Sequence, residues 1–335
     1  MYLNSSSFFI RMYFILLTFL IISCGQKEKT FQLERFEQDL FEPNQANNPN
    51  HYKKLQAKYG FFYQSFAENM LNISEEENSL AYGPSLSKFV TFPGIQQLKR
   101  EVDSVFPNME SIEGQLADAM EIFHDEFPAD IQPRFVTYLS EFNLGNATTD
   151  SVVGIGLDFY LGEKYPIYPA LEFPDFMVAK LCKEYLVPNT IKAFGIGKFE
   201  GQLTDKRFVA MMLFEGKIRY FMKSLLPDCP DSLIFSYSSK QLQWAKENEP
   251  MIWAHFIQNK LIFNEDPSSY MRYFNDGPFT IANGVPQESA PAMGIFSGYK
   301  IIEKYMKEHS SVSLKELMLN NNWDEILRES AYKPN

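Results

Sequence analysis

Histidine and cysteine are scarce in this sequence, and basic residues are outnumbered by acidic ones. Its 335 residues include four His and three Cys, so few side chains are available to bind a transition metal or to form a nucleophile–base pair. Lys and Arg total 31 against 42 Asp and Glu, which gives a net charge of −11. This balance argues against nucleic acid or an anionic membrane surface as the main partner. We expect no cofactor and no nucleic-acid partner.

Familiar catalytic patterns are also missing from the sequence. No two His have the spacing of the H-E-x-x-H zinc peptidases, and there is no G-x-S-x-G nucleophile motif. Cys182 and Cys229 lie in no context typical of a reactive thiol. Their separation leaves disulfide pairing open, and we favour two free thiols. These absences favour a binding protein over an enzyme.

No apolar run is long enough to cross a membrane, which takes about 20 residues. A shorter run after Arg11 ends in Ile21-Ile22-Ser23-Cys24, the pattern at which bacterial lipoprotein precursors are cleaved. We therefore predict a lipoprotein signal peptide at 1–23, lipidation of Cys24 and a polar tether at 24–30. An ordinary signal peptide with an incidental Cys is the alternative. Cleavage would remove Arg11 and no acidic residue, so the net charge would change from −11 to about −12.

Residues 31–335 are predicted to form a single large α+β domain that is predominantly helical. Apolar spacing typical of helices, punctuated by Pro, extends over 31–130 and resumes after Pro174. Between these parts, Arg134–Phe142 and Ser151–Phe159 are rich in β-branched and aromatic residues, which predicts two strands. Joined by a turn, the two strands would form a small antiparallel sheet.

Local signals place several helices within this domain. The apolar spacing predicts a first short helix over Leu33–Phe41, an acidic amphipathic helix over Met109–Phe127 and another helix over Asp175–Tyr185. One helix is expected to start at Ser238 or Ser239, with Gln241 placed to complete a capping box, and Ser313 with Glu316 is expected to cap another. Pro250 falls inside the helix that follows Ser238, so that helix should be kinked or divided.

A long helix that starts at Phe208 and is stopped by Pro227 carries the most informative carboxylate. Glu215 lies on its apolar stripe, where a charge is costly to bury unless it is paired. In H-E-x-x-H peptidases such a helix carries two zinc-binding His at i and i+4, with a Glu after the first. The window Phe214-Glu-Gly-Lys-Ile218 keeps the Glu and replaces both ligands, so it could not hold catalytic zinc. Glu215 is either a remnant of such a site or the i+4 partner of Arg219.

Three further side chains complete this predicted degenerate pocket. The helix after Ser238 carries Glu247 and Glu249, and in one zinc-peptidase class a Glu on the next helix is the third ligand. A position in the first turn of a helix is the competing explanation for Glu249. The region of Tyr299, together with Glu215, could supply the polar contacts of a small-molecule pocket. The predicted pocket therefore contains Phe214, Glu215, Ile218, Glu247, Glu249 and Tyr299.

Several motifs follow one another along nearly the whole mature chain. They are Arg35-Phe-Glu-x-Asp-Leu-Phe41, Ile155-Gly-Leu-Asp-x-Tyr-Leu-Gly162, Gly216-Lys-Ile-x-Tyr220, Leu225-Leu-Pro-Asp228, Trp244-Ala-x-Glu-Asn-Glu-x-x-Ile-Trp253, Gly277-Pro-Phe279, Glu288-Ser-Ala-Pro291 and Ser330-Ala-Tyr-Lys-Pro334. This ordered series resembles the gliding-motility lipoprotein B family (GldB) of Bacteroidetes. A match in order over a whole chain is far more specific than any one of these motifs.

The resemblance implies a lipoprotein of the cell envelope that is extracytoplasmic and held to the membrane through the lipid on Cys24. Its expected partners are other envelope proteins of the gliding machinery and the protein secretion linked to it. The family is also similar to zinc metallopeptidase-like proteins, which implies a degenerate peptidase-like unit over about 131–335. Without the two His, we expect no peptidase activity and a cleft that binds a partner or peptide. An envelope hydrolase with an unrecognised site and a small-molecule-binding lipoprotein are the alternatives.

Overall fold

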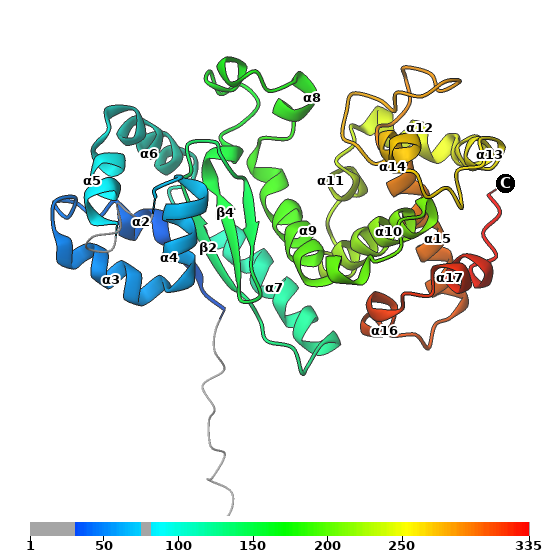
Figure 1. Ribbon diagram of the computed structural model, residues 1–335, viewed down its shortest axis with the longest axis horizontal. Coiled ribbons are helices and arrows are strands. Elements are labelled where there is room, and N and C mark those ends of the chain that lie inside the picture. Colours follow the sequence, from blue (N-terminus) through cyan, green and yellow to red (C-terminus); the bar gives the residue numbers. More distant parts are fainter. Residues whose placement is uncertain (1–30, 75–81, 335) are drawn as a thin grey trace, which may run out of the picture. The chain divides into compact units, whose positions relative to one another are not determined.

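The computed structural model of the chain describes residues 31–74 and 82–334 (Figure 1). The predicted signal peptide, the Cys24 lipidation site and the tether all lie outside these residues. Within the described part, no helix combines the length and the apolar character needed to span a membrane. Gln32–Asn335 form one compact unit of many helices and one four-stranded sheet. The predicted α+β class is therefore confirmed.

The sheet is small and mixed. Its strands are β1 (Leu33–Arg35), β2 (Arg134–Tyr138), β3 (Asn146–Thr148) and β4 (Val152–Gly156). They lie in the order β1-β2-β4-β3, with β1 and β4 parallel to β2, and β3 antiparallel to β4. Because β3 is the last strand of this order, its outer side has no neighbouring strand in the sheet.

The predicted antiparallel pairing of the two main strands is wrong. β2 and β4 are parallel, in register from Arg134 beside Val152 to Tyr138 beside Gly156. The expected turn between them contains β3, which pairs with the far side of β4. The predicted helix over Leu33–Phe41 is also wrong at its start, because its first three residues form β1 beside β2. Parallel strands covered on both faces have near-continuous apolar sequences, so their pattern does not reveal their direction.

Aromatic side chains from several helices cover one face of the sheet. The segments involved are α2 (Phe36–Leu40), α3 (Pro49–Tyr59), α4 (Phe61–Ser65), a π-helical turn (Phe66–Met70) and α5 (Gly83–Thr91). The ring of Phe36 has edge-on neighbours in Tyr59 and Phe66, with ring centroids 4.8 and 4.9 Å away. Val136 and Tyr138 of β2 belong to the same buried cluster. Aromatic burial of this kind is a large share of the stability of the unit.

The opposite face is covered by α9 (Leu186–Phe199), with α7 (Glu110–Glu126) beside it. Phe194 of α9 lies between Phe135 of β2 and Phe123 of α7, with ring centroids 6.4 and 5.0 Å away. α9 also passes close to β3. A Cβ added at Gly197 would lie 2.5 Å from Thr148 Oγ1, so this approach requires glycine.

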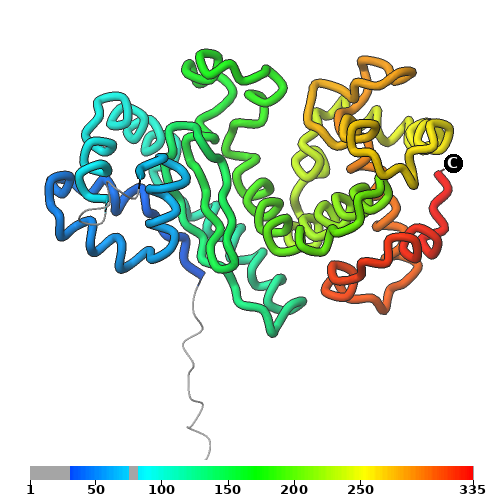
Figure 2. The backbone as a smooth tube through the Cα atoms, in the orientation of Figure 1, coloured from blue at the N-terminus to red at the C-terminus, as the bar shows by residue number. Residues whose placement is uncertain are grey.

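The predicted long helix is present as α10 (Phe208–Leu225), and it joins α9 to the C-terminal helices (Figure 2). It packs along α15 (Met293–Glu308) through two glycines that face each other. A Cβ at Gly216 would lie 2.3 Å from the carbonyl carbon of Gly298, and one at Gly298 would lie 1.8 Å from Met212 O. The two backbones therefore touch, and neither glycine can carry a side chain.

Shorter helices complete the unit. They are α6 (Pro93–Val105), α8 (Asp175–Val178), α11 (Asp231–Phe235), α12 (Ser239–Glu247), α13 (Glu249–Gln258), α14 (Pro267–Tyr270), α16 (Leu314–Leu319) and α17 (Trp323–Glu329). Both predicted capping boxes and the division of the helix at Pro250 are confirmed. The predicted helix over Asp175–Tyr185 is too long, because Cys182 forms a β-bridge with Leu161 that interrupts it. Cys182 and Cys229 are both free, as expected.

Candidate functional site

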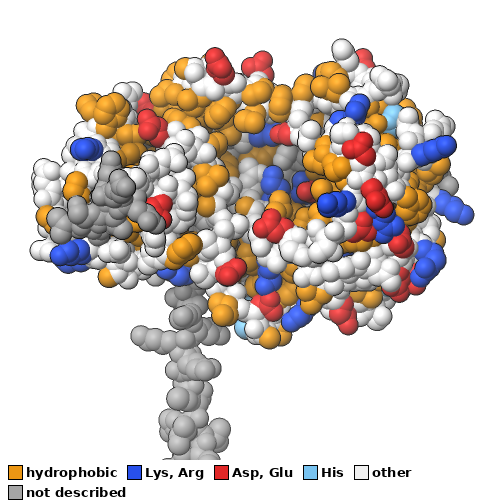
Figure 3. All heavy atoms as spheres, viewed as in Figure 1, with side chains coloured by type: hydrophobic (Ala, Val, Ile, Leu, Met, Phe, Trp, Pro, Cys, Tyr) orange, Lys and Arg blue, Asp and Glu red, His pale blue; other side chains and the backbone are white. Residues whose placement is uncertain are grey.

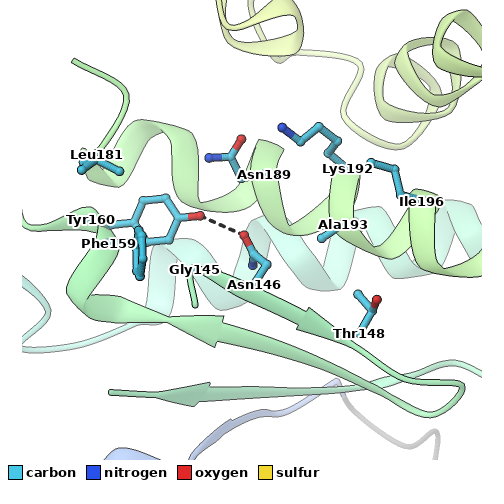
Figure 4. Close-up of a pocket in the computed structure, with 10 residues that line it drawn as sticks. All are labelled: Gly145, Asn146, Thr148, Phe159, Tyr160, Leu181, Asn189, Lys192, Ala193 and Ile196. Carbon is cyan, nitrogen blue, oxygen red and sulfur yellow. Dashed lines mark hydrogen bonds between the residues drawn. The ribbon is translucent and has the colours of Figure 1, made fainter. Parts of the chain in front are cut away.

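A groove of about 340 Å³ lies between the open edge of the sheet and α9 (Figure 4). Its size is within the range of small-ligand pockets. We call it the edge groove. Its lining residues come from β3 and the residue before it, the turn after β4, the segment before α9 and one side of α9. They are Gly145, Asn146, Thr148, Phe159, Tyr160, Leu181, Asn189, Lys192, Ala193 and Ile196.

The outer side of β3, two of whose residues line this groove, has free backbone groups. Gly156 N donates to Gly145 O at 2.7 Å, and Thr149 N donates to Val152 O at 2.9 Å. In an antiparallel pair the bonded residues alternate with residues whose backbone groups point outward. Asn146 and Thr148 are those outward residues, and no described residue bonds their backbone N–H or C=O. A free strand edge of this kind can accept an extended peptide as an additional strand.

A polar side-chain network fixes β3 from the side of α9. Tyr160 OH donates to Asn146 Oδ1 at 3.1 Å, and Asn146 Nδ2 donates to Gly154 O at 3.2 Å (Figure 4). Burial raises the pKa of Tyr160 to about 12, so the phenol remains a donor at neutral pH. This arrangement holds the edge strand in one position relative to the groove.

A fully buried carboxylate, Asp158, accepts hydrogen bonds from the loop that leads from β2 to β3. Asp158 Oδ2 accepts from Phe142 N at 2.7 Å and Ser140 N at 3.1 Å. Burial raises the pKa of Asp158 to about 6, against the opposing effect of these two backbone donors. Asp158 belongs to the Ile155–Gly162 motif of the sequence. Both of these Oδ2 bonds go to the backbone of the loop, so we assign Asp158 a positioning role.

One charged residue, Lys192, lines the groove. Lys192 of α9 is partly buried, and no described residue forms a hydrogen bond or ion pair with its Nζ. Burial, with the nearby Arg219, lowers the pKa of Lys192 to about 8, although Glu215 and Asp276 act in the opposite direction. Figure 3 shows Lys and Arg side chains gathered in a hollow near the middle of the described unit. The groove therefore offers an edge strand on one side and unpaired positive charge on the other.

The structure gives most members of the predicted degenerate pocket separate partners. Glu215 Oε2 lies 3.3 Å from Arg219 Nη1, so the predicted i+4 pair is confirmed. Tyr332 OH donates to Glu249 Oε1 and Gln243 Nε2 to the exposed Glu247, both at 2.8 Å, while Tyr299 OH donates to Glu303 at 3.0 Å. Phe214 and Ile218 are buried in the core. These contacts do not join the six residues into one site, and their common origin in a zinc site stays a prediction.

The residues of the edge groove were not predicted from the sequence. β3 lies within a stretch expected to be a turn, which hid the open strand edge. Lys192 is the one charged residue between Leu186 and Gly197 of α9, and that is the signal that could have marked it. Its proximity to Arg219 depends on how two helices cross, which no local pattern reveals.

Comparison with known proteins identifies one family. The sequence pattern of the family described as gliding motility protein GldB matches residues 23–334. No curated protein and no solved structure matches the chain. The family match covers nearly the whole chain and begins one residue before Cys24.

Proposed function

This chain belongs to the GldB family of gliding motility proteins, and we propose that it is a lipid-anchored envelope protein whose edge groove holds an extended segment of a partner without cleaving it. The observation that carries this proposal is the open edge of β3. Asn146 and Thr148 line the groove of about 340 Å³, and their outward backbone groups have no partner among the described residues. Main-chain bonds to a strand edge give affinity, and the neighbouring pockets give selectivity.

Anchoring at Cys24 is supported by the cleavage pattern Ile21-Ile22-Ser23-Cys24 and by the family match, which includes Cys24. One acylated Cys followed by a short tether would keep the folded unit at the membrane surface. Other envelope proteins of the gliding and secretion machinery are then the partners within reach. Cys24→Ala is expected to leave the precursor uncleaved or to move the protein out of the membrane fraction.

The absence of cleavage rests on the chemistry of the described groove residues. The side chains that line it include no Ser, Cys or His, and no described residue forms a hydrogen bond with the Thr148 hydroxyl or the Lys192 amine. A nucleophile and a base in contact, which covalent catalysis requires, are not among them. The groove size also suits a small molecule, and that alternative predicts binding that does not depend on the β3 backbone.

A degenerate peptidase-like unit over 131–335 belongs to the same proposal. Phe214 and Ile218 are separated by one helical turn of α10, where a zinc helix would carry its two His. The change of both residues to His, with zinc titrated into the folded variant, tests this ancestry separately from peptide binding. Zinc affinity that requires Glu247 or Glu249 supports the ancestry, and a folded variant without affinity contradicts it.

The β3 edge can be tested by a pair of substitutions at one position. A library of nine-residue random peptides displayed on ribosomes is selected for binding to the mature protein. The selected peptides are then synthesised. Thr148→Pro removes the outward N–H without removing a bond to β4, and proline is tolerated at such edge positions. Thr148→Ala keeps the N–H and serves as the control.

We expect Thr148→Pro to weaken the selected peptides at least about tenfold and Thr148→Ala to weaken them less than about threefold. Circular dichroism checks that both variants are folded. Equal binding to both variants would contradict strand addition, and a selection that yields no peptide would contradict the proposed function itself.

A further inference from the structure

α9 and α10 cross at a point that brings two cations from different helices together. A Cβ added at Gly195 of α9 would lie 3.0 Å from the ring of Phe221 and 3.6 Å from Ile218 Cδ1. Lys192 lies one helical turn before Gly195, and Arg219 follows Ile218 directly. The crossing therefore brings Arg219 close enough to act on the charge of Lys192, which is a lining residue of the edge groove.

Arg219 is buried without enough acceptors for its guanidinium group. The residue is 7% exposed, and its Nε and Nη1 atoms have no hydrogen-bond acceptor among the described residues. Glu215 Oε2 is 3.3 Å from Nη1, which makes an ion pair but not a hydrogen bond. A buried guanidinium has five donors that must be satisfied, and unmet donors cost free energy. The side chain is thus prepared for an acceptor that the described chain does not provide.

The charges around Lys192 leave one positive charge unbalanced. The charged groups that act on it are Arg219, Glu215, Asp276 and Lys180. Lys180 Nζ lies 2.5 Å from Asp276 Oδ1, and Arg219 is paired with Glu215. Both carboxylates of the cluster are therefore occupied, and Lys192 is left without one. A single monoanion would neutralise the cluster, whereas a phosphate dianion would exceed it.

We propose that Arg219 and Lys192 form a subsite for one carboxylate of the segment held in the edge groove. The planar fork of a guanidinium matches the two oxygens of a carboxylate, and the Lys192 ammonium supplies the balancing charge. The inference rests on the proposed function only in taking this carboxylate to be part of a bound peptide. Its source is the C-terminus of the peptide or an acidic side chain within it.

Three peptide pools identify the carboxylate and its source. The first contains acetylated random heptapeptides with a free C-terminal carboxylate, and the second contains the same sequences as C-terminal amides. The third contains the amides with Glu fixed at the central position. Acidic and amide side chains are left out of all random positions. The fraction of each pool retained by the mature protein is measured by mass spectrometry.

We expect one of the two carboxylate pools to be retained at least about tenfold more strongly than the plain amides. Arg219→Gln and Lys192→Gln should each reduce that preference to about threefold or less, and Arg219→Lys should restore part of it. Glu215→Gln removes the competing carboxylate and should strengthen the preference. Lys198→Gln is the matched control, because Lys198 lies on α9 but pairs with Asp130.

Failure of this subsite is distinguishable from failure of the groove as a peptide site. Equal retention of all three pools by the unsubstituted protein would overturn the carboxylate subsite and leave strand addition standing. Retention of no pool would overturn the peptide function. In that case acetate is titrated against chloride while the Arg219 Nε–H resonance is followed by NMR. A saturable shift supports the carboxylate site, and no shift overturns it.

Discussion

Lys217 and Arg219 lie two residues apart on α10, yet the described chain provides partners for the first side chain and too few for the second. Lys217 faces the C-terminal helices, where it is 1% exposed, donates to Asn320 O and lies 4.4 Å from the ring centroid of Trp323. Arg219 faces α9, where two of its nitrogen atoms have no described acceptor. Both cations are buried, so burial alone does not distinguish them. What distinguishes the α9 side is that the chain provides too few partners there.

The glycine contact with α15 packs α10 against the C-terminal helices. Breaking this contact should have the largest effect on stability. A Cβ at Gly298 would overlap Met212 O at 1.8 Å, which requires the helices to move apart. We expect Gly298→Ala to lower the free energy of unfolding by about 3 kcal/mol in urea denaturation.

Gly114 on α7 is the matched control for this substitution, because a Cβ there has no neighbour within 4 Å. Gly114→Ala should raise the free energy of unfolding by about 0.5–1 kcal/mol, since alanine favours helix. Equal effects of the two changes would contradict the backbone contact between α10 and α15.

The pH dependence of stability should report the buried Lys217. Burial lowers the pKa of Lys217 to about 7 in the folded chain, against an ordinary value of 10.5. Between these values the unfolded chain binds more protons, so the contribution of Lys217 to stability rises as pH increases. We expect a gain of about 3 kcal/mol from pH 7 to 9.5, at about 1.4 kcal/mol for each pKa unit. Lys217→Met should remove most of this slope in urea denaturation, and an unchanged slope would contradict the assignment.

A smaller pH effect is expected on the open side, and it concerns binding. The pKa of Lys192 is lowered to about 8 by burial and by Arg219, while Glu215 and Asp276 oppose the change and Lys180 adds to it. Only the protonated amine attracts a carboxylate. Affinity for a carboxylate peptide should therefore fall about tenfold from pH 7 to 9. Fluorescence anisotropy would show this fall in the unsubstituted protein and not in Lys192→Gln, and a fall of the same size in both would exclude Lys192 as its source.

Local chemistry in the sequence was sufficient to predict several helix boundaries. Ser238 with Gln241 and Ser313 with Glu316 form capping boxes because each pair needs only residues three apart. Pro250 divides its helix because it lacks an N–H, whatever packs around it. The Glu215–Arg219 pair was within reach for the same reason, since i+4 neighbours share a helix face.

The sheet and the edge groove could not be predicted in this way. The parallel pairing of β2 with β4 depends on a connection through β3, and a three-residue strand next to Asn143 and Gly145 has the sequence of a turn. Arg219 acts on the charge of Lys192 only because α9 and α10 cross near Gly195. Such contacts depend on tertiary packing, for which one sequence contains no periodic signal.

Amide hydrogen exchange in β3 tests the central claim most directly. The N–H of Thr148 points outward, whereas the N–H of its neighbour Ala147 already faces β4. NMR would follow both amides in the mature protein before and after addition of a selected peptide. A peptide that adds as a strand should slow exchange at Thr148 markedly and at Ala147 much less. Unchanged exchange at Thr148, with saturating peptide bound, would contradict binding at the edge groove.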